Sequence, residues 1–157
     1  MWELLAPYAA SLEGSALGVA ARTTTWLYPI ANLLHVLGAA LMVGAVATFD
    51  VQVMRSAPNA TLVVRAGIPV AICGLLLQLA SGVVLVSAET TTVIRNPAFL
   101  AKMAFLLLAV ANIALFHLRF RVPLATGQLP PGAKPLALVS LTSWTGVLLA
   151  GRAIAYL

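Results

Sequence analysis

One histidine lies inside a long apolar stretch of the sequence, and its imidazole is the group there best suited to chemistry. His35 occurs in the run Tyr28-Pro-Ile-Ala-Asn-Leu-Leu-His-Val-Leu-Gly38. Imidazole carries a titratable proton and binds metals, and an ionisable group within hydrocarbon is costly unless it has a partner or a function. His35 is therefore the first candidate ligand for a haem iron or another metal.

Three other polar side chains fall at a similar depth in three other apolar stretches. Counted at about 1.5 Å per residue from the outer end of each stretch, the depths are about 12 Å for His35, about 14 Å for Gln78, about 6 Å for Lys102 and about 8 Å for Arg152. A haem b needs an axial nitrogen in the apolar layer and cations nearer the surface for its propionates, which His35 beneath Lys102 and Arg152 would supply. Alternatively, the two cations extend to the lipid headgroups and His35 hydrogen-bonds a neighbouring helix.

The second histidine, His117, lies about 28 Å from the outer end of its stretch by the same count. The offset of about 16 Å prevents His35 and His117 of one subunit from holding the same haem, whose axial ligands are only about 4 Å apart. His117 is thus an alternative ligand or a solvated histidine at the membrane edge. Met103 and Met42 offer thioether sulfur to iron or copper, although packing is the commoner role of methionine, and Gln78 is suited to an interhelical hydrogen bond.

The composition places these residues in a membrane. The chain has 157 residues, of which 62% are hydrophobic and 8% charged, and a soluble core of this size cannot hide so much apolar surface. A membrane-spanning helix needs about 20 mostly apolar residues. Four segments meet this requirement, residues 27–49, 62–87, 98–118 and 136–157. They predict an all-α integral membrane four-helix bundle over residues 26–157.

Residues 1–25 precede the first predicted span and lack the basic start of a cleavable signal peptide. Their apolar side chains recur at roughly helical spacing from Trp2 to Val19, opposite Glu3 and Glu13. This pattern predicts an amphipathic helix that lies on the membrane interface.

Basic residues gather in the loops after the first and third spans and at the adjoining span edges, namely Arg55, Arg65, Arg119, Arg121 and Lys134. By the positive-inside rule, we expect a multi-pass membrane protein with both termini on the side away from the cytoplasm. The net charge of +5 then reflects topology and not nucleic-acid binding. Asp50, near Arg55 at the predicted cytoplasmic edge, is expected to form an ion pair there.

Three runs carry a resemblance to a known family: Arg22 followed by Trp26-Leu-Tyr-Pro and His35-Val-Leu-Gly38, then Gly44 to Asp50, then Asn96-Pro-Ala-Phe-Leu-Ala-Lys102. Together they resemble an uncharacterised family of small bacterial four-helix membrane proteins. That family is distantly similar to the copper-resistance D-type and HemJ-type protoporphyrinogen oxidase membrane proteins. The resemblance implies haem b binding, at positions matching His35, Lys102 and, more loosely, His117. It also implies that the side that holds both termini is the periplasm of a bacterial inner membrane. The chain departs from the usual Asp-Leu-Arg pattern, because Asp50 is followed by Val-Gln-Val-Met-Arg.

The sequence therefore predicts a small membrane protein that binds one haem b near the periplasmic side and passes electrons, as a subunit or homo-oligomer with a redox partner. It favours an electron-transfer or accessory protein over a stand-alone enzyme. Two alternatives are a copper-handling protein that uses Met103 or Met42, and a cofactor-free structural subunit. Small residues from Gly38 to Ala45 permit close helix contacts, within the bundle or between subunits. The single cysteine excludes an iron–sulfur ligand set and a covalent c-type haem.

Overall fold

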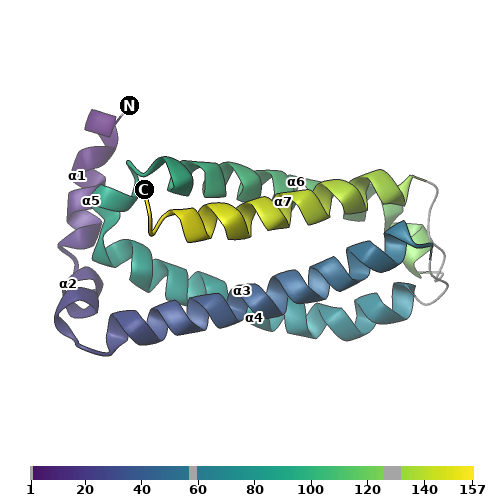
Figure 1. Ribbon diagram of the computed structural model, residues 1–157, viewed down its shortest axis with the longest axis horizontal. Helices are drawn as coiled ribbons and strands as arrows, with labels where there is room; N and C mark the ends of the chain where they lie inside the picture. The colour runs from purple at the N-terminus through teal and green to yellow at the C-terminus, as the bar shows by residue number, and fades with distance from the viewer. Residues whose placement is uncertain (1, 57–59, 126–131) are drawn as a thin grey trace.

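The computed structural model describes residues 2–56, 60–125 and 132–157, and four long helices run side by side in it with shorter helices across one end (Figure 1). These residues form the helices α1 (Trp2–Glu13), α2 (Ala16–Thr23), α3 (Leu27–Met54), α4 (Ala60–Ala88), α5 (Thr90–Val93), α6 (Pro97–Ala125) and α7 (Ala133–Ala153). No strand occurs in the described ranges. The all-α four-helix bundle predicted from the sequence is confirmed.

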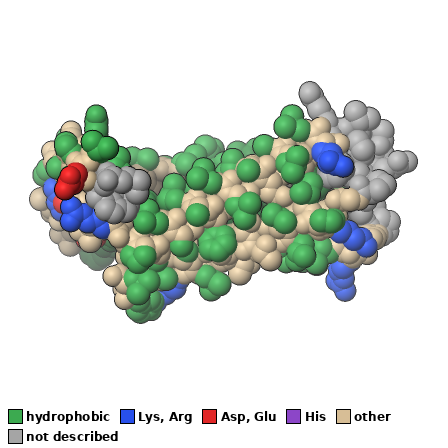
Figure 2. Space-filling model, turned by 90° about the horizontal axis from the view of Figure 1, so that it is seen from above, with side chains coloured by type: hydrophobic (Ala, Val, Ile, Leu, Met, Phe, Trp, Pro, Cys, Tyr) green, Lys and Arg blue, Asp and Glu red, His purple; other side chains and the backbone are tan. Residues whose placement is uncertain are grey.

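Four of the helices are long and apolar enough to cross a membrane. The candidate spans are Leu27–Met54, Arg65–Ala88, Pro97–Arg119 and Ala133–Ala153. In the most apolar part of each span only 17–22% of the residues are buried inside the bundle, so most of these side chains are at least partly exposed. Hydrophobic side chains accordingly cover much of the middle of the molecule in Figure 2. This outward apolar surface indicates a multi-pass membrane protein.

The fourth long helix ends earlier than its composition suggests. The sequence predicts a span that continues to Leu157, whereas α7 ends at Ala153 and the following residues form a turn, in which the Tyr156 amide donates to the Ala153 carbonyl at 3.0 Å. Apolar composition continues past the end of the helix without a glycine or proline to mark the stop, so the sequence gives no signal for it.

The long helices pack in the order α4, α3, α7, α6, with α3 against α4 over most of its length, while α4 and α6 approach each other less closely. Glycines permit the closest of these contacts. A Cβ atom on Gly38 would lie 2.8 Å from the Gly74 carbonyl oxygen, and one on Gly74 would lie 2.6 Å from the Met42 amide nitrogen. Gly44 would meet no atom within 4 Å. Within the predicted small-residue stripe, Gly38 is therefore required at the α3–α4 crossing and Gly44 is not.

Hydrophobic side chains fill the bundle in two clusters. The central cluster contains Met42, Val43, Ala109, Trp144 and Val147. The second cluster lies toward the end where α3 ends and α7 begins, and there Phe49 packs edge-on against Phe116 with ring centroids 5.7 Å apart. Its buried members are Val53, Phe116, Ala133 and Ala137. The central cluster separates two groups of polar side chains, one toward each end of the bundle.

The first 25 residues form two helices, α1 and α2, that cross the end of the bundle where the chain also terminates (Figure 1), instead of the single helix predicted. Ser15 causes the break. Its hydroxyl oxygen accepts a hydrogen bond from the Gly18 amide at 3.2 Å and donates to the Leu12 carbonyl at 2.6 Å. A serine that satisfies a free amide in this way starts a new helix.

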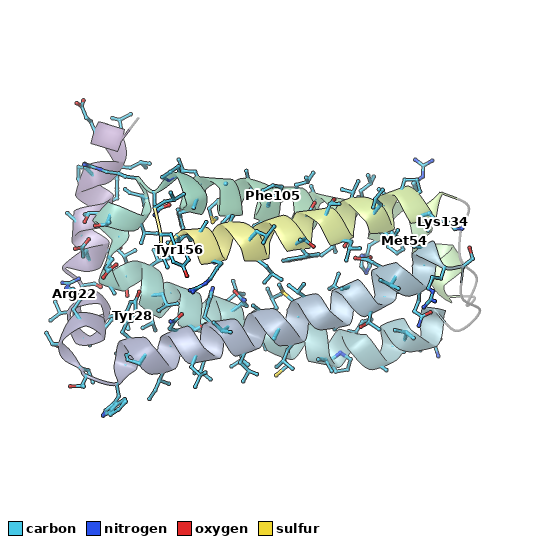
Figure 3. The ribbon with its side chains drawn as sticks, viewed as in Figure 1. Arg22, Tyr28, Met54, Phe105, Lys134 and Tyr156 are labelled. Carbon is cyan, nitrogen blue, oxygen red and sulfur yellow. The ribbon has the colours of Figure 1, made fainter. Side chains whose placement is uncertain are left out.

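Arg22 and Glu13 attach this N-terminal segment to the bundle. The Arg22 guanidinium donates to the Ala88 carbonyl at 2.9 Å and to the Glu13 carbonyl at 2.8 Å. The Glu13 carboxylate accepts from the hydroxyl of Thr91 at 2.6 Å and from its amide at 2.9 Å. These bonds from Thr91 hold the pKa of Glu13 below its usual value. Figure 3 labels Arg22 at this end of the molecule.

Candidate functional site

His35 lies on the inward side of α3, three residues before Gly38, where α3 crosses α4 closely. The imidazole is half-buried, and a Cβ on Gly82 of α4 would lie 3.2 Å from its Cε1 atom. Gly82 thus leaves the space that the ring needs. The ring meets a side chain at each nitrogen, because Nδ1 lies 3.0 Å from the Ser81 hydroxyl and Nε2 lies 3.3 Å from the Lys102 ammonium.

The hydrogen bonds of Ser81 determine which nitrogen of His35 carries the proton. The Ser81 hydroxyl donates its single hydrogen to the Leu77 carbonyl of its own helix. Its oxygen therefore accepts from the other side, and His35 Nδ1 is the donor. In neutral imidazole the second nitrogen, Nε2, then holds a lone pair, and this lone pair accepts from Lys102. In this tautomer Nε2 carries no proton, and an unprotonated ring nitrogen can act as a metal ligand or a base.

Gln78 adds a third contact between α3 and α4. Its side-chain nitrogen donates to the backbone carbonyl of His35 at 3.1 Å. Because Gln78 and Ser81 are three residues apart on α4, they project from the same side of that helix. The interhelical hydrogen bond predicted for Gln78 is present. Ser81 was not predicted, although its spacing from Gln78 is the signal that it shares the same face.

Lys102 reaches the cluster from α6, which packs against α7. It is half-buried, and its side chain passes Gly151 of α7, where an added Cβ would lie 3.7 Å from the Lys102 ammonium. Among the residues that the structure describes, the one ion pair joins Arg22 and Glu13. The Lys102 ammonium therefore has a histidine nitrogen, and no described carboxylate, as its partner inside a span.

Arg152 points to a different partner. Its guanidinium hydrogen-bonds the Tyr156 hydroxyl and lies 4.8 Å from the centre of the Tyr156 ring. Figure 3 labels Tyr156 at the end of α7. Arg152 is exposed, as expected of an arginine that extends toward the membrane surface. The structure thus joins His35, Gln78 and Lys102 and leaves Arg152 outside this cluster.

The two candidate methionines also lie outside it. Met42 is 7% exposed and packs in the central hydrophobic cluster beside Trp144. Met103 follows Lys102 in the chain and is 38% exposed. In both positions the side chain has a packing or lipid-facing environment, and neither sulfur takes part in the hydrogen-bonded cluster around His35.

His117 belongs to the second group of polar residues, near the opposite end of the bundle. It is exposed, and its Nδ1 donates to the Ile113 carbonyl of its own helix at 2.9 Å. It borders a cavity of about 160 Å³ together with Asp50, Asn112 and Ser140. Asp50 follows His35 by fifteen residues on α3, which is about 22 Å along the helix. The two histidines therefore belong to separate sites.

The ion pair predicted between Asp50 and Arg55 is wrong. Asp50 is 3% exposed and accepts a hydrogen bond from Ser140, whereas Arg55 is exposed. Five residues along a helix correspond to a rotation of about 140°, so the two side chains leave α3 on different faces. Sequence proximity suggested a pair that the helical rotation does not allow.

Comparisons with protein-family models, with curated proteins and with solved structures found no match. The function must therefore be argued from the chemistry of the site. Among the described residues no three histidine, cysteine or acidic side chains come together as a metal-ligand group. The His35 cluster provides instead one imidazole nitrogen with a lone pair, one ammonium group and a hydroxyl that orients the ring.

Proposed function

We propose that this membrane protein binds one haem b at His35 and passes electrons. The observation that carries the proposal is the environment of the His35 ring. The Ser81 hydroxyl oxygen accepts a hydrogen bond from the Nδ1–H group, so the Nε2 lone pair faces Lys102, a cation for which the described residues supply no carboxylate. A carboxylate-bearing ligand that also accepts an imidazole nitrogen would satisfy both groups.

His35, Ser81 and Lys102 are chemically suited to hold a haem. Histidines that bind metals usually donate their other ring N–H to an oxygen, which fixes the tautomer and the ring orientation, and Ser81 provides that oxygen for His35. The Lys102 side chain is flexible and lies alongside Gly151, which has no side chain to restrict it. Lys102 would therefore exchange its contact with Nε2 for a contact with a propionate. Haem supplies one-electron chemistry when it is bound. His35 would hold the iron, and the positive charge of Lys102 would offset a propionate charge in the apolar layer.

Arg152 takes a secondary role in this proposal. Its guanidinium already has the Tyr156 hydroxyl and ring as partners. A propionate would have to compete with Tyr156 for it, whereas Lys102 lies directly against His35. We therefore assign propionate binding first to Lys102.

The proposed orientation places the His35 cluster near the periplasm of a bacterial inner membrane. The opposite end carries exposed Arg55, Arg65, Arg119 and Lys134, and the positive-inside rule puts such an end in the cytoplasm. Figure 2 shows basic side chains at the right-hand end of the bundle, and another group of charged side chains at the left-hand end. Reporter fusions at Gly132 and after Leu157 test this orientation, with a cytoplasmic signal expected from the first and a periplasmic signal from the second.

A single imidazole gives the iron one protein ligand at this level of the bundle. A second ligand would come from a redox partner, an exogenous molecule or His35 of a second copy of the chain. The spin state of the iron shows whether a second ligand is bound. A five-coordinate high-spin spectrum in the intact detergent complex would exclude the dimeric ligand arrangement.

A cofactor-free structural subunit is the second candidate function, and one observation favours it. Both ring nitrogens of His35 and its backbone carbonyl already have protein partners on α4 and α6. Such a satisfied network can simply hold helices together.

The visible absorption spectrum of the purified protein separates the two candidates. The haem proposal predicts a Soret band that is lost in His35→Ala and retained in His117→Ala, with both variants inserted in the membrane. A colourless wild-type protein that remains colourless after reconstitution with haemin would support the structural function and overturn the proposal.

A further inference from the structure

The second polar group surrounds a cavity that the haem proposal does not use. The cavity has a volume of about 160 Å³ and receives side chains from α3, α4, α6 and α7. Its polar lining consists of Asp50, Asn112, His117 and Ser140, and every other lining residue is apolar, aromatic or glycine. A cavity of roughly 150 Å³ holds a molecule the size of benzene, so this space admits several heavy atoms and not merely a single ion.

Asp50 contributes one oxygen atom that has no partner. One side of its carboxyl group accepts a hydrogen bond from Ser140. Its Oδ2 atom is buried and has no hydrogen-bond partner among the described residues, and the residue as a whole is 3% exposed. A carboxylate in apolar surroundings is costly without a proton or a counter-ion.

The aromatic lining adds a second feature suited to a cation. Phe49 and Phe116 both line the cavity and meet edge to face. Aromatic rings attract cations, and recognition of organic ammonium groups often combines such rings with an acid. A divalent metal ion, by contrast, takes about six oxygen ligands. The described residues contain no cluster of three acidic, histidine or cysteine side chains that could hold one.

The cavity is also reachable. Exposed side chains border it, including Ile68, Ile113 and His117. Asp50 lies four residues before the end of α3, about 6 Å along the helix. A ligand can therefore enter near the boundary between the membrane and water, where an organic cation with an apolar body partitions readily.

From these features we propose that the cavity around Asp50 binds one small organic ammonium ion, of the protonated primary alkylamine class. The ammonium group pairs with Asp50 Oδ2, and the alkyl part lies against the apolar wall between α3, α4 and α6. The site is independent of His35, from which the central hydrophobic cluster separates it.

Isothermal titration of the purified full-length protein in detergent with n-butylammonium chloride tests the proposal. We expect saturable binding of about one ion per chain, and no comparable binding of n-butanol, which has the same shape without the charge. Asp50→Asn is expected to weaken binding by about thirtyfold or more, as is usual when one member of a buried charge pair is removed. Glu89→Gln is the matched control, because it removes one exposed negative charge elsewhere and is expected to leave binding unchanged.

A pair of glycine variants keeps the test decisive if Asp50→Asn does not fold. Gly67 lines the cavity, and a Cβ there would meet its nearest neighbour, Ala45, at an ordinary 3.8 Å. Gly67→Leu fills the space while retaining Asp50 and is expected to abolish binding, whereas Gly44→Leu, outside the cavity lining, is expected to preserve it. Equal binding in Asp50→Asn or Gly67→Leu, displacement by equimolar sodium or potassium, or no saturable binding to the wild type would each overturn the proposal.

Discussion

The two polar groups of the bundle satisfy buried polar atoms in different ways. Toward the end covered by α1 and α2, His35 engages both ring nitrogens and its backbone carbonyl with side chains from α4 and α6. Toward the other end, the Asp50 carboxyl group accepts a hydrogen bond from Ser140. Its buried Oδ2 atom has no partner among the described residues. Both residues belong to the same helix, α3. In the first group the polar atoms of His35 have protein partners, while the Lys102 charge has no described carboxylate. In the second group the open position is an acidic oxygen, so the two groups suit ligands of opposite charge.

This contrast shows what each arrangement is suited to do. A fully bonded network fixes a side chain in one orientation and one tautomer, as the Ser81 hydroxyl does for His35. A partly bonded one raises the free energy of the protein until something pairs with it. Because Met42 and Trp144 of the central cluster lie between the groups, substitutions in one group are expected to leave the other largely unchanged.

The strongest test of the comparison disrupts both groups at once. Gly74→Leu introduces a side chain whose Cβ would lie 2.6 Å from a backbone nitrogen of α3, which cannot move aside without separating α3 from α4. We expect a loss of about 3 kcal/mol or more in unfolding free energy, measured by thermal unfolding in detergent. Gly44→Leu is the control, and an equal loss in both variants would show that the close α3–α4 crossing is not what positions the groups.

Leucine substitutions of His35 and Asp50 are expected to change the stability of the protein in opposite directions. His35→Leu leaves Ser81 and Lys102 without their shared partner and is expected to destabilise the protein by about 1–3 kcal/mol. Asp50→Leu removes a buried carboxyl group that has one unpartnered oxygen and is expected to stabilise the ligand-free protein by about 1 kcal/mol. Unfolding curves of the two purified variants check this prediction. Destabilisation of similar size in both would remove the distinction between the two groups.

Removal of the ring-orienting hydroxyl is expected to have a smaller effect, confined to the first group. Ser81→Ala removes the acceptor of the His35 Nδ1 proton and is expected to cost about 1 kcal/mol. It also frees the ring to change tautomer, which ring-nitrogen NMR shifts would detect. Thr142→Ala removes a hydroxyl that bonds only backbone carbonyls of its own helix and serves as the control. An unchanged tautomer in Ser81→Ala would contradict the role given to Ser81.

The smallest expected effect concerns the attachment of α1 and α2, outside both groups. The bonds from Thr91 lower the pKa of Glu13 in the folded protein. Their contribution is therefore present above the unfolded-state value of about 4.3 and is lost as the pH falls through the lower folded value. The protection of α1 amides against hydrogen exchange, corrected for the slower intrinsic exchange at low pH, is expected to fall on acidification in the wild type. Glu13→Gln lacks this titration, so the same acid response in that variant would refute the assignment.

Much of the fold was predictable because long apolar runs have few alternatives in a membrane. The depths of Lys102 and Gln78, close to that of His35, were also predictable, because the rise per residue along a helix is constant. The failures concern rotation about the helix axis and local hydrogen bonds. Arg152 lies at a suitable depth but bonds Tyr156, and the break at Ser15 follows from one cap that the amphipathic pattern hides.

Asp50 shows why the second group could not be inferred from sequence. Its neighbour Arg55 suggested an ion pair, and the residues that surround it, Asn112 and Ser140, come from helices more than sixty residues further along the chain. Only the packing of α3 against α6 and α7 reveals the cavity. A buried aspartate in an apolar segment is a signal in itself, but its partners depend on tertiary structure.

We propose that His35 holds a haem through Nε2, with Lys102 as the partner of a propionate. The most direct test of this proposal is the visible absorption spectrum of the purified wild-type protein beside His35→Ala, Lys102→Leu and His117→Ala. We expect a haem spectrum that disappears in His35→Ala, weakens in Lys102→Leu and persists in His117→Ala. A pigment that survives in His35→Ala and is lost in His117→Ala would contradict the proposal, and so would a wild-type protein that has no haem spectrum before or after reconstitution.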